Sequence, residues 1–245
     1  MRSILTVVLL FATASAYSRV DEWDHFIFSQ EWPQTACLLG KLEHKQCLIP
    51  SYITSFVIHG LWPSEGNTLG PENCTGTPFD MNLIKNLTNE LNHYWPNLYN
   101  NTEKDDFWRH EWSTHGTCAV SLEATGTEYL FFRKTLDLMK TYNITTFLNA
   151  GKIVPSDTNV YTAAAVESNL SSQLGHDVDL QCFYSKNFGA DSKTGILSEV
   201  RICMDKKFNV ISCKNPNTKL YFRSGKKAHT ETCNGKIRFP EIKRS

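Results

Sequence analysis

The sequence predicts an α+β fold, in which helices pack on a mainly antiparallel central sheet that is stapled by disulfides. Helical segments gather in the middle of the chain and strand-like segments lie at both ends, an order typical of this class. The 245 residues show no internal repeat, no low-complexity segment and no linker rich in Gly, Ser or Pro. We therefore expect a single domain over residues 17–245, after a signal peptide over residues 1–16.

The strands follow from residue types and alternation. Residues 26–28 predict a short strand that leads to Trp32-Pro33. Residues 55–59 are β-branched and aromatic, and Gly60 and Pro63 end this second strand. Alternating apolar residues predict three later strands, over residues 178–184, 197–204 and 208–211.

The helices follow from apolar residues at helical spacing. This period predicts helices over residues 80–94, 105–114, 127–142 and 158–174. Pro96 closes the first helix, and Gly175 stops the last. Asp105 and Asp106 suit the N-terminal end of the second helix, where the helix dipole favours negative charge.

The N-terminus has the pattern of a secretory signal. Arg2 gives a positive start, residues 4–12 are apolar, and Ala14-Ser15-Ala16 is a small-residue cleavage site before Tyr17. This apolar run and every later one fall short of the ~18 residues that a membrane helix needs. We expect a secreted protein without a transmembrane segment.

The eight cysteines all lie in the mature chain. An even number behind a signal peptide predicts disulfides, and the absence of any C-x-x-C motif argues against a zinc ribbon. Spacing alone leaves about 105 pairings open.

Charge and glycosylation motifs are unevenly spread. Residues 206–245 carry a net charge of +9, and residues 17–205 carry −10. This basic segment could attract RNA or acidic glycans, although a solvated basic face is the simpler interpretation. Five N-x-S/T motifs are candidate glycosylation sites, and Asn73 is the doubtful one because Cys74 should enter a buried disulfide. These motifs begin at Asn73, Asn86, Asn100, Asn143 and Asn169.

The most informative segment is residues 110–118. It holds His110, Glu111 and His115, which share one face with Thr114 if the segment is helical. A zinc hydrolase needs its second histidine four residues after the first, where Thr114 stands, and no G-x-S-x-G motif supports a serine hydrolase. We therefore expect no metal and no cofactor.

Acid–base cleavage of RNA fits these residues better. The nucleophile is the 2′-hydroxyl of the substrate, so the protein must supply only a base, an acid and donors for the charged phosphorane. His59 offers a third imidazole from the 56–63 segment. Four of the remaining histidines are assigned to packing or to the surface, namely His44, His93, His176 and His229.

Residues 56–63 and 110–118 resemble the two active-site signatures of the ribonuclease T2 family, F-x-I-H-G-L-W-P and H-E-W-x-K-H-G-T-C. The similarity extends through Trp32-Pro33, Cys37 and the cysteine pattern, and so covers most of the mature chain. The chain also resembles, more loosely, the omega-type ribonucleases secreted by schistosome eggs.

The resemblance implies the role of each residue. His115 would be the general base for the 2′-hydroxyl, and His59 the general acid for the leaving oxygen. Glu111 would stabilise the transition state, and His110 would bind phosphate. The first product would be a 2′,3′-cyclic phosphate.

The resemblance also implies contacts and pairings. Trp62 and Phe107 match positions where relatives stack bases, with core packing as the equally weighted alternative. The implied disulfides are Cys37–Cys47, Cys74–Cys118, Cys182–Cys233 and Cys203–Cys213.

Two positions depart from the family pattern. Thr114 replaces a lysine, and loss of one transition-state donor costs about 10²–10³-fold in rate, so we expect a slower enzyme. Without that ammonium, the pKa of His115 should be higher than in relatives, and Arg109 should project away from the site. Ser64 replaces an acidic residue that helps some relatives to select a base, so we expect broad specificity.

The alternative is a secreted glycoprotein with weak or no catalysis that binds a host or cell-surface partner. His59, Glu111 and His115 argue against it, because a binding module has no need of this constellation. The expected partners are single-stranded RNA and a glycan-recognising receptor that could direct uptake into endosomes or lysosomes. We expect a monomer.

Overall fold

The computed structural model describes residues 22–66, 68–188, 194–213 and 230–244. The predicted signal peptide and a large part of the predicted basic segment lie outside these residues. None of the described helices is both long and apolar enough to cross a membrane.

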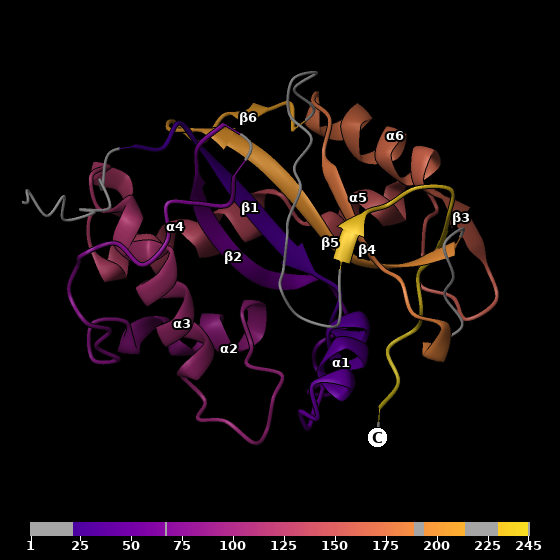
Figure 1. Cartoon of the computed structure of the whole chain (residues 1–245), viewed down its shortest axis with the longest axis horizontal. Helices are drawn as coiled ribbons and strands as arrows, with labels where there is room; N and C mark the ends of the chain where they lie inside the picture. Colours follow the sequence, from indigo (N-terminus) through magenta and orange to yellow (C-terminus); the bar gives the residue numbers. More distant parts are fainter. Residues whose placement is uncertain (1–21, 67, 189–193, 214–229, 245) are drawn as a thin grey trace, which may run out of the picture.

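One sheet forms the centre of the described fold, and its main path has the order β2-β1-β5-β4-β7 (Figure 1). All described strand pairs are antiparallel except that of β5 with β8. The predicted α+β class with a mainly antiparallel sheet is therefore confirmed. The strands are β1 (His25–Glu31), β2 (Val57–Ser64), β3 (Val160–Thr162), β4 (Asp179–Phe183), β5 (Thr194–Asp205), β6 (Val210–Ile211), β7 (Thr230–Thr232) and β8 (Lys236–Arg238).

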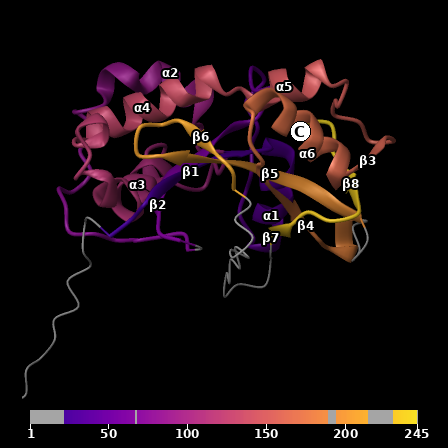
Figure 2. The same cartoon turned by 90° about the horizontal axis from the view of Figure 1, so that it is seen from above.

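Six α-helices accompany this sheet in the described part of the chain. They are α1 (Pro33–Leu42), α2 (Thr88–Tyr94), α3 (Asp106–Thr114), α4 (Glu128–Thr141), α5 (Ile144–Ala150) and α6 (Ala163–Leu174). Helices α4, α5 and α6 cover one face of the sheet (Figure 2). Helix α3 lies beside β2, so these two elements can share one site (Figures 1 and 2).

The central strand β1 determines which residues of its neighbours meet. It pairs with β2 on one side and with β5 on the other, and Ser29 lies opposite both Gly60 and Arg201. Its Gln30 is fully buried, and the amide bonds both Tyr142 O and Ile144 N at the junction of α4 and α5. This strand thereby anchors the helical layer to the sheet.

Several helix limits differ from the prediction. Residues 80–84 are not helical, because the Asp80 carboxylate bonds the backbone N–H of Asn82 and forms a local turn that competes with a helix. The expected 158–174 helix begins only at Ala163, where the Thr162 hydroxyl caps it, and β3 precedes it.

Other elements were missed by the periodicity analysis. Helix α1 begins directly after β1 with Pro33 at its first position, which is a favourable place for proline. Helix α5 is only 7 residues long and is capped by Asn143. The short strands β7 and β8 exist through pairing with β4, β5 and β3, which local sequence does not reveal.

Four disulfides staple the fold, in the pairing that the resemblance implied. They join Cys37 to Cys47, Cys74 to Cys118, Cys182 to Cys233, and Cys203 to Cys213. The second bridge fixes the segment that follows α3 and so restrains the end of the candidate site.

We expect replacement of Cys74 and Cys118 by alanine to lower the free energy of unfolding more than the same replacement of Cys37 and Cys47. The two bridges span 44 and 10 residues. Loop-closure entropy assigns them about 4 and about 2.7 kcal/mol, respectively. Urea unfolding of the two double variants measures this difference, and equal losses would contradict the entropic explanation.

Candidate active site

Strand β2 brings His59 and Trp62 to the edge that faces α3. The His59 side chain is 31% exposed, whereas its neighbours in β2 are buried. The Trp95 indole donates to the carbonyl oxygen of His59 at 3.0 Å, and the Trp108 indole donates to Trp95 O at 2.7 Å. These two buried indoles fix the backbone beneath the imidazole.

Helix α3 supplies the residues on the opposite side. Its Phe107 is half-buried, His110 is exposed and Glu111 is buried. His115 follows as the C-terminal cap residue and is only 6% exposed. The helical face predicted from the sequence therefore exists, although its last member lies at the helix end.

Gly60 allows β2 and α3 to come into contact. A Cβ atom at this position would overlap both Nε1 of Trp62 and Oε2 of Glu111. Without it, the Trp62 indole donates to the Glu111 carboxylate at 3.0 Å. Glycine is thus required here by close approach.

The Trp62 indole is the centre of the cluster. Its ring centroid lies 5.1 Å from that of His59 and 5.5 Å from that of His115. The ring centroid of His110 lies 6.4 Å from that of His115, and Phe107 lies 5.9 Å from His59. The structure therefore brings all six predicted site residues together.

Glu199 on β5 is a site residue that the sequence analysis missed. Its Oε1 lies 3.0 Å from Nδ1 of His59, and its Oε2 accepts hydrogen bonds from Arg201 and Ser29. A sequence signal was present, because Glu199 and Arg201 stand on either side of Val200 in β5 and so share one face. The long-range partner of that face could not be read from the sequence.

The two central histidines have opposite pKa shifts. Burial alone would lower the pKa of His59, but the carboxylates of Glu199, Glu31 and Glu111 outweigh it and raise the pKa to about 10. Burial lowers the pKa of His115 to about 3, helped by the positive charges of His110 and His59. At neutral pH, His59 is therefore an acid and His115 a free base.

Two nearby carboxyl groups have raised pKa values. Burial raises the pKa of Glu111 to about 7, although the His59 charge and the Trp62 hydrogen bond oppose it. Burial, followed by the negative charge of Glu199, raises the pKa of Glu31 to about 7 against the charges of His59 and Lys45. Perturbed groups of this kind concentrate at functional sites.

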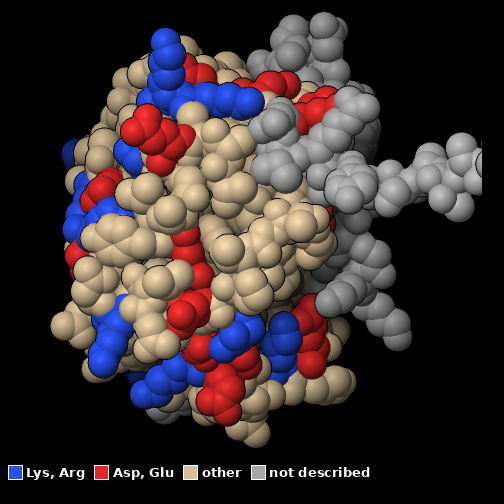
Figure 3. All heavy atoms as spheres, turned by 90° about the vertical axis from the view of Figure 1, so that its left-hand side faces the viewer, with Lys and Arg blue, Asp and Glu red and all other residues tan. Residues whose placement is uncertain are grey.

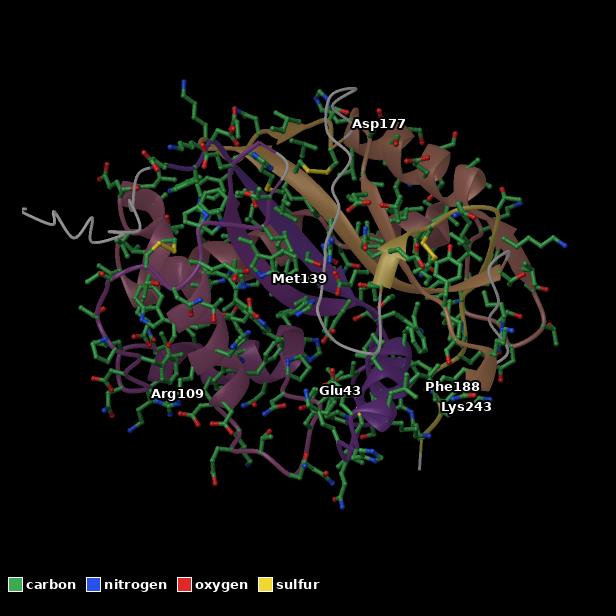
Figure 4. All side chains as sticks on the ribbon, in the orientation of Figure 1. Glu43, Arg109, Met139, Asp177, Phe188 and Lys243 are labelled. Atoms are coloured by element: carbon green, nitrogen blue, oxygen red, sulfur yellow. A yellow bond between two sulfur atoms is a disulfide. The ribbon has the colours of Figure 1, made fainter. Side chains whose placement is uncertain are left out.

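Burial holds the pKa of His115 below the ordinary histidine value, and a pKa higher than in relatives that carry the lysine stays a prediction. The Thr114 hydroxyl lies 3.4 Å from Nδ1 of His110 and brings no charge. Arg109 points away from the site, as expected: it pairs with Asp105 at 2.7 Å and lies at the periphery (Figure 4). Ser64 is buried with its hydroxyl on Trp62 O, so it cannot contact a base.

In the described part of the chain, no group of three or more His, Cys, Asp and Glu side chains is arranged to hold a metal ion.

Lys and Arg are interspersed with Asp and Glu on the face drawn in Figure 3. Residues 214–229 of the predicted basic segment lie outside the described residues, so its role stays a prediction.

The glycosylation motifs differ in accessibility. Asn73, Asn86 and Asn100 are exposed. Asn143 caps α5, and the amide of Asn169 packs against Gly151 with its oxygen buried. The exposed asparagines, including the doubted Asn73, have more room for a glycan.

A protonated imidazole and a neutral one, 5.1 and 5.5 Å from the same indole ring, are the groups that an acid–base site needs. The model of the Ribonuclease T2 family matches residues 23–213. Ribonuclease Oy of Magallana gigas is 44% identical over 194 residues, covering 78% of this chain and 88% of that protein. Ribonuclease T2 of Danio rerio is 32% identical over 211 residues, covering 86% and 81%.

A solved structure, RNase NT in complex with 5′-AMP, superposes with a TM-score of 0.71 at 28% identity. The match covers 91% of this chain and 100% of that one. The chain belongs to the ribonuclease T2 family and is a ribonuclease of that class.

We expect Gly60→Ala to reduce activity by at least about tenfold, because the added methyl group must separate Trp62 from Glu111. Gly70→Ala is the matched control, since its Cβ would meet nothing closer than 3.6 Å. RNA cleavage rates of both folded variants, with near-UV circular dichroism of the tryptophans, test this. Full activity of Gly60→Ala would show that the contact can relax without consequence.

Proposed function

We propose that this chain is a secreted endoribonuclease that cleaves single-stranded RNA by acid–base transphosphorylation, using no metal or cofactor. The 2′-oxygen attacks the neighbouring phosphorus, the bond from phosphorus to the 5′-oxygen breaks, and a 2′,3′-cyclic phosphate forms. His115 takes the proton of the 2′-hydroxyl, and His59 gives its proton to the leaving 5′-oxygen.

The observation that carries this proposal is the placement of two imidazoles next to the Trp62 ring, with His59 against the Glu199 carboxylate and His115 buried. Burial keeps His115 neutral, as a base must be, and surrounding carboxylates keep His59 protonated, as an acid must be. General acid–base catalysis requires this combination at the working pH.

The remaining residues have supporting roles in the proposed reaction. Glu111 lies against Trp62 and would stabilise the charged phosphorane, while the exposed His110 would bind phosphate. Half-buried Phe107 contacts His59 and is the ring that we propose stacks a base. Trp62 is only 4% exposed, so we propose that it packs and orients rather than stacks.

Substrate choice and destination are part of the same proposal. The buried Ser64 supports broad base specificity. Four disulfides and the exposed motifs at Asn73, Asn86 and Asn100 support secretion as a glycoprotein. A glycan-recognising receptor would then direct uptake into endosomes or lysosomes. It stays a prediction that the protein is a monomer and that it is close to the omega-type ribonucleases.

With EDTA present, we expect the purified mature protein to cleave single-stranded RNA and leave 2′,3′-cyclic phosphate ends. His59→Phe should lose about 10²–10⁴-fold in rate, because the leaving oxygen then lacks its acid. His93→Phe is the matched control, since this exposed histidine lies on α2. Absence of cleavage by the folded wild type from acidic to neutral pH would refute the proposal.

We expect Thr114→Lys to increase the rate by as much as about 10²–10³-fold, because it restores a cationic donor next to His115. Ser113→Lys adds the same charge at the preceding exposed position and is the control. Steady-state kinetics on a short RNA measures both. An unchanged rate for Thr114→Lys would mean that other groups already supply this charge.

A further inference from the structure

We propose that Glu199 and Arg201 of β5 are positioning residues that hold the His59 imidazole protonated and aimed at the leaving oxygen. The catalytic part of this inference rests on the proposed function. The placement of the proton on His59 does not, and it can be measured without any substrate.

The geometry engages both oxygens of Glu199. Oε1 lies 3.0 Å from Nδ1 of His59. Oε2 accepts from Nε of Arg201 at 3.0 Å, lies 2.8 Å from its Nη2, and accepts from the Ser29 hydroxyl at 3.1 Å. A carboxylate with this set of donors is held in one orientation and in its ionised form.

This orientation determines what His59 can do. Because Nδ1 is bonded to Glu199, the proton available for transfer is the one on Nε2. Nδ1 of His115 is buried and has no hydrogen-bond partner among the described residues. The two imidazoles thus differ in their supporting residues as well as in burial.

Arg201 acts one step further from the reaction. Its side chain is 5% exposed and lies over the Trp62 ring, with its guanidinium carbon 5.4 Å from the ring centroid. Its charge lowers the pKa of Glu199 below the usual range, although burial opposes this. Asp179 lies on the other side of the guanidinium, 3.7 Å from Nη1.

Other ionisable groups also face His59. Glu31 approaches from β1 and Glu111 from α3, and both raise its pKa, but their own pKa values are raised to about 7. They lose charge on acidification, whereas Glu199 does not. His115, from the end of α3, has its pKa lowered by the charge of His59. Glu199 is therefore the carboxylate that keeps His59 charged across the acidic and neutral range.

The deciding variant is Glu199→Gln, which keeps the shape of the side chain and removes the charge. We expect the titration midpoint of His59, followed by NMR of labelled histidines and assigned with His59→Phe, to fall by roughly two pH units or more. The alkaline limb of kcat/KM should move down with it, so that the rate loss at pH 9 exceeds the loss at pH 5 by about tenfold.

Glu128→Gln is the matched control, because Glu128 is also a buried glutamate. Its carboxylate accepts from the backbone N–H of Asp80 instead of contacting a histidine, and its pKa is raised to about 7. It should leave the titration of His59 unchanged. Arg201→Met should raise the titration midpoint of the Glu199 carboxyl, because the guanidinium no longer stabilises its ionised form, whereas Arg201→Lys should change that midpoint less. If Glu199→Gln does not fold, the His59 midpoint of the wild type decides the question, because it should lie well above the ordinary value of about 6.5.

An unchanged His59 midpoint in folded Glu199→Gln, an ordinary His59 midpoint in the wild type, or equal Glu199 midpoints in Arg201→Lys and Arg201→Met would overturn the inference. So would a rate loss that is the same at every pH, which would indicate a merely structural role. If the wild type cleaves no RNA, the proposed function is refuted. If the His59 midpoint still falls in Glu199→Gln, the placement of the proton on His59 is nevertheless supported.

Discussion

The contact between β2 and α3 at Gly60 is the constraint on which the site depends. Because no side chain stands at Gly60, the Trp62 indole can donate to the Glu111 carboxylate. That hydrogen bond ties a strand of the sheet to the helix that carries Phe107 and His110. The Cys74–Cys118 disulfide holds the chain just after the helix, so the position of His115 is set from both sides.

The charges beneath His59 are difficult to explain by stability. Glu199 and Arg201 are almost completely buried, and the desolvation of such a pair often equals or exceeds its attraction. Apolar residues of similar volume could fill the same space at no loss of stability. A role in keeping His59 charged explains why two ionised side chains occupy this buried part of β5, beside the apolar Val200 and Ile202.

Local sequence was sufficient for the parts of the site that lie within short motifs. Segment 56–63 lies almost wholly in β2, which runs through Gly60 and Pro63 instead of ending there, and segment 110–118 covers the end of α3 and the turn after it. All six predicted site residues meet. Glu199 could not be assigned, because its contact with His59 depends on the register of β1 with both β2 and β5. The turn at Asp80 and the short strands β7 and β8 were missed for related reasons, since single hydrogen bonds or distant partners decide them.

The absent lysine and the charged His59 are connected. A lysine beside His115 would carry positive charge up to its ordinary pKa of about 10.4. Glu199 and its neighbours keep His59 charged to about pH 10, so the site holds a cation over a similar pH range without an ammonium group. However, His59 must give its proton to the leaving oxygen, and a charge that is donated cannot also remain to stabilise the phosphorane. The His59 charge therefore compensates for Thr114 before the proton moves but not afterwards, which is why a slower reaction is still expected.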